Sequence, residues 1–261
     1  MYDEQKKKDP EVFTDSIKVD DRVLRTVVSH LEAINLHKTD LDVKGVAFEQ
    51  FMDGFFKGDF GQYFTPRPII EFAVKMTAPE HDWDVLDTSC GSGGFLLYAL
   101  DYIRHQATEY YEKGSADHYR YWHDFAEKHL YGIEINDFAV TVAKTALWIA
   151  ESQMMKETED IVHMNLDFLP LTTNAFIVEG NSLQIDWESI VPKYQVSYIM
   201  GNPPFHGFTF MTAEQKQDMQ NIFPGVKNLD FVCAWYKKAS DYIRGTKIEV
   251  AFVSTNSIVQ R

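Results

Sequence analysis

The segment with the clearest chemical signature runs from Val196 to Phe208, where an apolar stretch breaks into Asn202-Pro203-Pro204-Phe205. Proline fixes its own φ angle and restricts the residue before it, so the tetrapeptide is predicted to be a stiff loop with a predetermined path. Such a loop holds the Asn202 side-chain oxygen and nearby main-chain carbonyls as fixed hydrogen-bond acceptors, and Phe205 adds an aromatic face. Two acceptors and a ring suit a planar base that bears an amino group.

This arrangement suits methylation of an exocyclic amine. The lone pair of the adenine amine is delocalised into the ring, and acceptors that hold both N–H hydrogens favour a pyramidal nitrogen whose lone pair is available. No strong base is needed before attack, which accounts for the neutral Asn202. The methyl donor would be a sulfonium cofactor, and a base in duplex DNA would have to rotate out and stack on Phe205. Taken alone, the loop also fits an ordinary turn at a strand end.

Short apolar runs alternate with amphipathic stretches along most of the chain. This alternation predicts an α/β fold in which helices cover both faces of a mostly parallel sheet. In such sheets ligands bind at the carboxyl ends of the strands, so the residues after each run are the candidates for chemistry. The alternating stretches are residues 84–87, 95–104, 130–134, 138–153, 175–179, 196–200, 229–243 and 248–254.

Three other strand ends carry candidate ligand-binding residues. Asp87 ends the first run and opens DTSCGSGGF, where glycines permit a tight turn and close approach to a ligand. This segment lacks the G-x-G-x-x-G pattern and a following lysine, which disfavours dinucleotides and nucleoside triphosphates. Glu134 ends the second run, where an acid can accept both hydroxyls of a ribose. Asn181 follows the third run and can donate and accept hydrogen bonds to a heterocycle.

The chain is predicted to divide near residue 58. Apolar residues recur every three or four positions in much of residues 12–56, so residues 1–57 are expected to form a helical N-terminal region. The loop GDFGQYFTPRP interrupts this pattern and opens a second domain over residues 58–261. Residues 104–128 are interpreted as an insertion after the first helix of that domain, either a solvated helical pair, which is the simpler interpretation, or a surface for a partner.

Composition restricts the class of protein. No segment approaches the ~20 apolar residues of a membrane span and no signal peptide is evident, so a soluble, cytoplasmic protein is expected. Cys90 and Cys233 lie far apart without paired ligands, so neither a disulfide framework nor a metal site is expected. A net charge of -14 argues against binding of nucleic acid over the whole surface.

GQYFTPRP, DTSCGSGGF, GIEIN and GNPPF, in this order, resemble motifs X, I, II and IV of the gamma-class N6-adenine DNA methyltransferases of restriction-modification systems. The resemblance begins near Ala47 and extends to the last residue. Its first half is similar to type I modification subunits, and its later part to the methylase region of single-chain enzymes that combine restriction and methylation. It implies a Rossmann-like sheet that uses S-adenosylmethionine to methylate the N6 amine of a flipped-out adenine.

The resemblance also implies roles for individual residues. Asn202, Pro203 and Phe205 would form the target-adenine site, and Glu134 would bind the ribose of the cofactor. The chain departs from the family in two places: Thr88-Ser89 replaces the usual Pro-Ala, and Asn181 stands where many relatives have an Asp that faces the cofactor's adenine. Altered or weaker cofactor affinity is therefore expected. The residues expected to contact the cofactor are Tyr63, Phe64, Thr65, Pro66, Asp87, Gly91, Ser92, Gly93, Gly94, Glu134 and Asn181.

The family sheet has seven strands, whereas the fifth expected strand, residues 248–254, lies almost at the last residue. The last two strands and a target recognition domain are therefore expected to be absent from this chain. DNA would be read by a recognition domain or a specificity subunit elsewhere, with specificity and restriction subunits as the expected partners. The acidic composition of this chain is consistent with another domain or subunit making most contacts to the DNA phosphates.

Three alternatives remain open from the sequence. Methyltransferases that act on ribosomal RNA or on protein glutamine also use an Asn-Pro-Pro-aromatic loop, although GQYFTP before the glycine-rich loop disfavours them. A cofactor-binding scaffold that is inactive without partner chains is a second possibility. A nuclease is a third, supported only by Asp42-Val43-Lys44, which lacks a partner acid in a strand.

Overall fold

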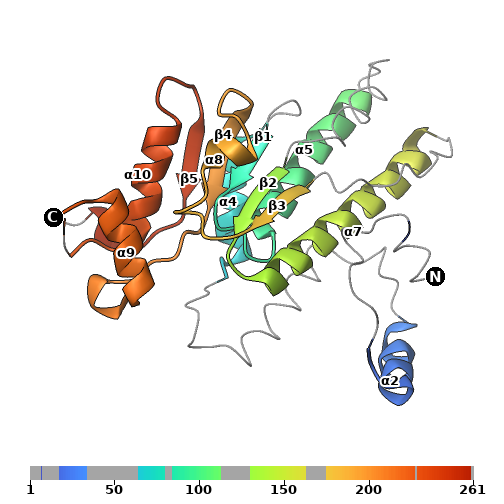
Figure 1. Cartoon of the computed structure of the whole chain (residues 1–261). Helices are drawn as coiled ribbons and strands as arrows, with labels where there is room; N and C mark the ends of the chain where they lie inside the picture. Colours follow the sequence, from blue (N-terminus) through green and yellow to red (C-terminus); the bar gives the residue numbers. More distant parts are fainter. Residues whose placement is uncertain are drawn as a thin grey trace.

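The computed structural model describes residue 7 and residues 18–33, 64–79, 84–112, 130–162, 175–226 and 228–259. Five parallel strands form one sheet in the order β3-β2-β1-β4-β5 (Figure 1). The chain builds outward from β1 in one direction and then, beginning with β4, in the other. The carboxyl ends of β1 and β4 are therefore a topological switch point, where ligands bind in sheets of this kind. The strands are β1 (Asp84–Asp87), β2 (Leu130–Glu134), β3 (Ala175–Glu179), β4 (Val196–Gly201) and β5 (Glu249–Phe252).

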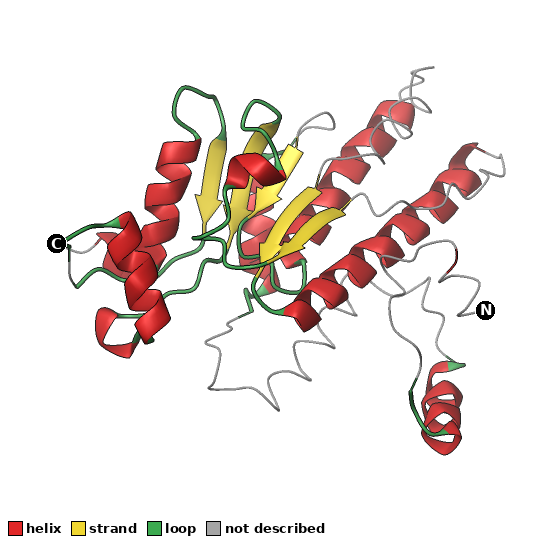
Figure 2. Cartoon of the chain, viewed as in Figure 1, coloured by secondary structure: helices red, strands yellow, loops and turns green. Residues whose placement is uncertain are grey.

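Helices cover both faces of this sheet, as Figure 2 shows. One core lies between the sheet and α4, α5 and α7, and the other lies between the sheet and α8, α9 and α10. The helices are α2 (Asp21–Leu31), α4 (Arg67–Thr77), α5 (Gly94–Glu112), α7 (Asp137–Val162), α8 (Trp187–Ile190), α9 (Ala213–Ile222) and α10 (Val232–Tyr242), with short 3₁₀ turns η2 (Phe208–Phe210) and η3 (Asn256–Val259).

The apolar runs reflect strands that are buried on both faces. Successive side chains of a strand point to opposite sides, so Tyr198 and Met200 of β4 enter the first core whereas Ile199 enters the second. In β1, Val85 and Leu86 divide in the same way. The predicted parallel sheet with helices on both faces is confirmed, and each predicted strand is present.

The helix boundaries differ from the predictions in several places. The helix expected over residues 95–104 extends as α5 to Glu112, so the start of the expected insertion is helical. The helix α9 was not predicted at all, although its start carries a capping box. Gln215 N donates to Thr212 Oγ1 at 3.2 Å, and Thr212 N donates to Gln215 Oε1 at 2.9 Å.

Part of the predicted domain division lies outside the described residues. Within residues 12–56 the helix α2 is present, and none of its side chains is buried. Asp42-Val43-Lys44, most of the loop of residues 58–68 and residues 113–129 are not among the described residues. The helix α4 begins at Arg67, with Pro66 at the N-cap position and Pro68 in its first turn, where a missing N–H costs no intrahelical hydrogen bond.

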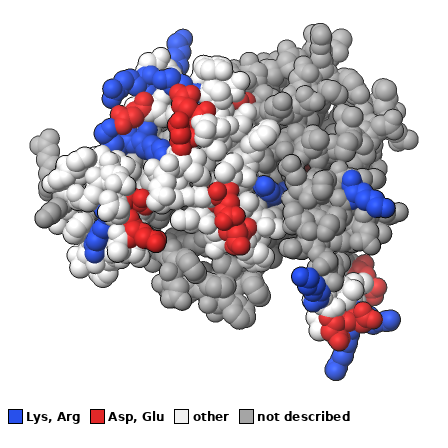
Figure 3. Space-filling model, viewed as in Figure 1, with Lys and Arg blue, Asp and Glu red and all other residues white. Residues whose placement is uncertain are grey.

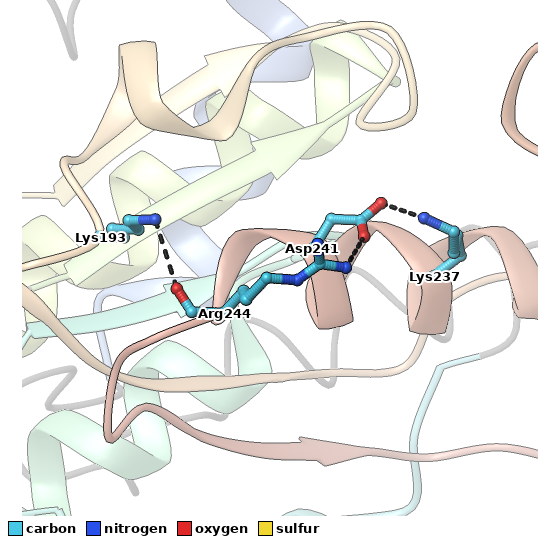
Figure 4. Close-up of polar contacts among 4 residues, drawn as sticks. All are labelled: Lys193, Lys237, Asp241 and Arg244. Atoms are coloured by element: carbon cyan, nitrogen blue, oxygen red, sulfur yellow. Dashed lines mark hydrogen bonds and ion pairs between the residues drawn. The ribbon is translucent and has the colours of Figure 1, made fainter.

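Basic side chains gather around the amino-terminal ends of β4 and β5, interleaved with acidic ones (Figure 3). On α10, Asp241 pairs with Lys237 and with Arg244, whose Nη2 lies 3.1 Å from Asp241 Oδ1 (Figure 4). Lys193 Nζ lies 3.5 Å from the Arg244 carbonyl oxygen. Lys193 precedes β4 and Arg244 precedes β5. This exposed cluster therefore lies at the amino ends of the strands, on the side of the sheet away from their carboxyl ends.

Close packing around β2 predicts that Gly132→Ala destabilises the fold. A Cβ at Gly132 would lie 2.9 Å from Cys90 Sγ and 3.1 Å from Ile177 Cγ1. Overpacking of this kind typically costs about 1–3 kcal/mol, which urea unfolding measures. Gly207→Ala is the matched control, because its Cβ would meet Phe210 at an ordinary 3.8 Å. Equal unfolding midpoints for both variants would contradict the prediction.

Candidate active site

The carboxyl ends of β1 to β4 carry the candidate residues, and Glu134 at the end of β2 connects two of the loops there. Its side chain is 7% exposed. Gly91 N donates to Glu134 Oε2 at 3.0 Å, and Asn136 N donates to Oε1 at 2.9 Å. The carbonyl oxygen of Glu134 accepts from Gly180 N at 2.8 Å. Glu134 thus holds the glycine-rich loop with its side chain and the loop before Asn181 with its backbone.

The carboxylate of Glu134 retains capacity for a ligand. Burial raises its pKa, and the hydrogen bonds from the backbone N–H groups of Asn136 and Gly91 partly offset that effect. Each carboxylate oxygen has two lone pairs, so each can accept a further hydrogen bond beside the one from the backbone. A pair of hydroxyl groups, as on a ribose, matches that remaining capacity.

The glycine-rich loop lies close to two other elements. Gly91 and Gly93 have φ angles of 53° and 87°, which glycine adopts readily. A Cβ at Gly93 would lie 3.2 Å from the Ala143 Cβ on α7, so the loop approaches this helix closely. A Cβ at Gly91 would lie 4.0 Å from Phe64 Cε1, which places the Phe64 ring beside the loop.

The residues just before α4, and the first residue of that helix, lie beside the glycine-rich loop. Phe64 is half-buried, Thr65 is buried and Pro66 is exposed. Ser92 is buried within the loop. A Cβ at Gly94 would lie 3.6 Å from Arg67 Nη1, which again joins this segment to the glycine-rich loop. Tyr63 lies outside the described residues.

Beneath the glycine-rich loop is a group of buried polar atoms. Asp87 is 0% exposed, and burial raises its pKa to about 8, although the hydrogen bond from Ser89 N at 3.0 Å partly opposes that shift. Among the described residues, no hydrogen-bond partner is present for Asp87 Oδ2, Thr88 Oγ1 or Ser89 Oγ. Buried polar atoms are normally paired, so these three favour a polar ligand group or bound water at this position.

The Asn-Pro-Pro-Phe loop begins directly against Asp87. Gly201, the last residue of β4, has a φ of 151°, and a Cβ there would lie 2.5 Å from Asp87 Oδ1 and 3.3 Å from Ser89 Oγ. Only glycine permits this approach. Asn202 is half-buried with its side-chain oxygen shielded from solvent, Pro203 is buried and Phe205 is half-buried. The loops after β1 and β4 are therefore in contact.

The far end of the loop is held by residues that the sequence did not indicate. His206 N donates to Asp230 Oδ1 at 3.1 Å, and Phe231 N donates to the His206 carbonyl oxygen at 3.0 Å. At the near end, Val253 N donates to the Gly201 carbonyl oxygen at 2.9 Å. The path of the loop is fixed on both sides of Asn202. The only sequence signal for Asp230 is an acid shortly before α10, a common position for bonding to a helix start.

Asn181 lies after β3, one residue beyond the Gly180 bond to Glu134. Asn181 Oδ1 accepts from Leu183 N at 2.9 Å, and Asn181 Nδ2 donates to Asp218 Oδ2 at 2.8 Å. Asp218, on α9, was also not predicted. The structure thus places Phe64 and Glu134 next to the glycine-rich loop, and Glu134 also contacts the loop that contains Asn181. Asp87 contacts Gly201, at the start of the Asn202 loop.

The family model described as "MmeI, DNA-methyltransferase domain" matches residues 72–261, which is more than half of the chain. The chain belongs to this family. Membership in the MmeI methyltransferase-domain family confirms the predicted resemblance to restriction-modification methyltransferases and favours it over the RNA, protein-glutamine and nuclease alternatives. The family match includes the glycine-rich loop, Glu134, Asn181 and the Asn202 loop.

Two proteins that are similar to this chain are also DNA methyltransferases or methylase subunits by name. DNA methyltransferase A of Bacillus subtilis (strain 168) is 38% identical over 182 residues, which cover 67% of this chain and 21% of that protein. The type I restriction enzyme EcoEI methylase subunit of Escherichia coli is 26% identical over 187 residues, covering 71% of this chain and 32% of that subunit. This chain therefore spans a third or less of these relatives.

The fold has a solved counterpart in the type IIL restriction-modification enzyme MmeI, whose structure is a complex with DNA. The two share 27% identity and a TM-score of 0.59, over 93% of this chain and 30% of that one. The predicted Rossmann-like methyltransferase sheet is confirmed. No described helix is long and apolar enough to cross a membrane. In the described part of the chain, no cluster of three His, Cys, Asp or Glu residues is arranged to hold a metal ion.

Asp87→Asn is expected to flatten the pH dependence of stability. Because the fold raises the pKa of Asp87 from 3.8 to about 8, the folded protein binds more protons here than the unfolded chain between these values. Wild-type stability should therefore fall as pH rises through this window. The fall can reach several kcal/mol, since one pKa unit corresponds to about 1.4 kcal/mol.

Urea unfolding of the wild type and of Asp87→Asn, at intervals from about pH 4 to about pH 8, measures how the free energy of unfolding of each protein changes with pH. The raised pKa of Glu134 acts in the same direction in both proteins, so the difference between the slopes isolates Asp87. Parallel slopes would show that Asp87 is ionised in the folded state at neutral pH.

Proposed function

We propose that this chain is the catalytic part of a site-specific DNA methyltransferase of a restriction-modification system, which transfers a methyl group from S-adenosylmethionine to the N6 amine of a flipped-out adenine. One observation carries the proposal: the glycine-rich loop and the Asn-Pro-Pro-Phe loop are in contact at Asp87, Ser89 and Gly201. A site that joins a cofactor to a target amine needs its two binding loops adjacent.

The residues on the cofactor side fit the chemistry of S-adenosylmethionine. The remaining lone pairs of Glu134 suit the ribose hydroxyls, and the buried atoms of Asp87, Thr88 and Ser89 can bind the charged ends of the methionine portion. When bound, S-adenosylmethionine supplies a methyl group on a positively charged sulfur, which keeps the C–S electron pair. The remaining proposed contacts are Tyr63, Phe64, Thr65, Pro66, Gly91, Ser92, Gly93, Gly94 and Asn181.

On the target side, Asn202 accepts an N–H of the amine, and main-chain carbonyls of the stiff loop accept the other. This favours the nitrogen geometry whose lone pair can form the new N–C bond, after which the surplus proton passes to solvent. Pro203 fixes the path of the loop, and Phe205 stacks on the extruded base. The half-buried position of Phe205 leaves part of its surface available for that contact.

DNA recognition is assigned to other parts of the assembly. The chain has a net charge of -14, and its described basic cluster at the amino ends of β4 and β5 contains Asp241. We infer that a recognition domain or specificity subunit supplies most phosphate contacts, and that restriction subunits are further partners. Residues 58–261 would be the methyltransferase domain, residues 1–57 a helical region before it, and the cytoplasm the place of action.

Calorimetric titration with S-adenosylmethionine tests the cofactor site. Glu134→Ala should weaken binding at least tenfold, because the loss of two charge-assisted hydrogen bonds is worth more than ~1.4 kcal/mol. Asn202→Ala should bind as wild type within about threefold, since the proposal places Asn202 on the target base. Asp241→Ala, an exposed acid at the opposite edge, is the matched control.

Circular dichroism and thermal melts must first show that each variant is folded, because Glu134 also holds Gly91. A folded wild type without measurable affinity, or a Glu134→Ala variant with unchanged affinity, would contradict the assigned site.

A further inference from the structure

The loop of residues 180–186 after β3 is attached to α9 by a buried acid. Asp218 is 4% exposed. Its Oδ2 accepts from Asn181 Nδ2 at 2.8 Å, and its Oδ1 accepts from Gln184 Nε2 at 2.9 Å. Both carboxylate oxygens therefore bind side-chain amides of a single loop, more than thirty residues earlier in the chain. A buried acid needs such partners, because an unpaired charge in the interior is costly.

These contacts fix the orientation of the Asn181 amide. An ionised carboxylate only accepts hydrogen bonds, so the Asn181 NH₂ group must face Asp218. The amide oxygen then faces Leu183 N, which donates to it at 2.9 Å. An asparagine held by one contact can exchange its oxygen and nitrogen by rotation, whereas these two contacts exclude the exchange. One N–H and one lone pair of known orientation remain for a ligand.

The backbone of this loop has a separate attachment to α10. Lys238 Nζ donates to the Ser182 carbonyl oxygen at 2.7 Å and also to the Ile185 carbonyl oxygen, and it lies 5.3 Å from the centre of the Trp187 ring. Trp187 Nε1 donates to the same Ser182 carbonyl at 2.9 Å. The fold of the loop thus does not depend on Asp218 alone, so the carboxylate can be altered while the loop remains in place.

The loop also lies beside the proposed ribose contact. Gly180 N donates to the Glu134 carbonyl oxygen at 2.8 Å, and Asn181 is the next residue. If Glu134 binds the ribose, an amide one residue beyond Gly180 is suitably placed for the heterocycle attached to that ribose. The edge of adenine carries a donor amine next to a ring-nitrogen acceptor, which an oriented amide can match with two hydrogen bonds.

We propose that Asp218 is a positioning residue that orients the Asn181 amide toward the adenine edge of the cofactor and makes asparagine, rather than aspartate, the suitable residue at position 181. The inference rests on the proposed function. An aspartate at position 181 would place a second carboxylate within hydrogen-bond distance of the buried Asp218, and the two like charges would repel. The asparagine at position 181 then has a specific partner, Asp218.

A charge-exchange series tests the pairing. Titration with S-adenosylhomocysteine compares wild type, Asn181→Asp, Asp218→Asn and the double variant, with Glu214→Gln on α9 as the matched control. Asn181→Asp should weaken binding roughly tenfold or more, and the double variant should recover part of that loss, because the asparagine at 218 can donate to the aspartate at 181 and the repulsion is removed, whereas the N–H for the ring nitrogen stays absent. An Asn181→Asp variant that binds as wild type, or a double variant with no recovery, would overturn the proposal.

A second readout separates orientation from simple structural support. S-inosylhomocysteine carries hypoxanthine, whose edge has an acceptor where adenine has a donor. Wild type should prefer the adenosyl compound roughly tenfold or more, as for a bidentate amide contact, and Asp218→Ala should reduce that preference to about threefold or less. A variant that loses affinity for both compounds equally would show structural support only and overturn the proposal. A folded wild type that binds neither compound would instead reject the proposed cofactor site, and the positioning role with it.

Discussion

The buried carboxylate of Glu134 is the contact on which the rest of the candidate site depends. Its side chain accepts from Gly91 N and Asn136 N, and its carbonyl oxygen accepts from Gly180 N. Hydrogen bonds to a charged group contribute about 1.5–3 kcal/mol each, and removal of such partners would leave a buried charge without compensation. The same carboxylate therefore holds two strand-end loops and still offers lone pairs to a ligand.

A second constraint acts between β1 and β4, where the Asp87 carboxyl occupies the space that a side chain at position 201 would need. Burial raises the pKa of Asp87 to about 8, so its neutral form prevails at neutral pH and a second negative charge near Glu134 is avoided. A cationic group bound beside Asp87 would lower this pKa, because an opposite charge favours the ionised form. The proposed sulfonium cofactor is positively charged at sulfur, so its binding and the ionisation of Asp87 are expected to be linked.

The parts of the structure that could be predicted are those with a local cause. The run from Val196 to Met200 is apolar because both faces of β4 are buried. The two prolines after Asn202 restrict the backbone and so predict a stiff loop. Asp218 and Asp230 could not be predicted, because each acts on residues more than twenty positions away, and only the fold shows that they meet. The helix α9 was not predicted for a different reason. Its capping residues, Thr212 and Gln215, are present in the sequence, but the helix has too few apolar residues to show a helical repeat.

The chemical identity of the methylated product tests whether the Asn202 loop presents an adenine amine to the cofactor, as proposed. The protein, with any recognition subunit that it requires, would be incubated with unmethylated DNA and methyl-labelled S-adenosylmethionine, and the digested nucleosides analysed by mass spectrometry. Label is expected on N6 of deoxyadenosine with the wild type, and Asn202→Ala is expected to lose this labelling while it still binds the cofactor. Label on cytosine, or undiminished labelling by Asn202→Ala, would exclude this role for the Asn202 loop.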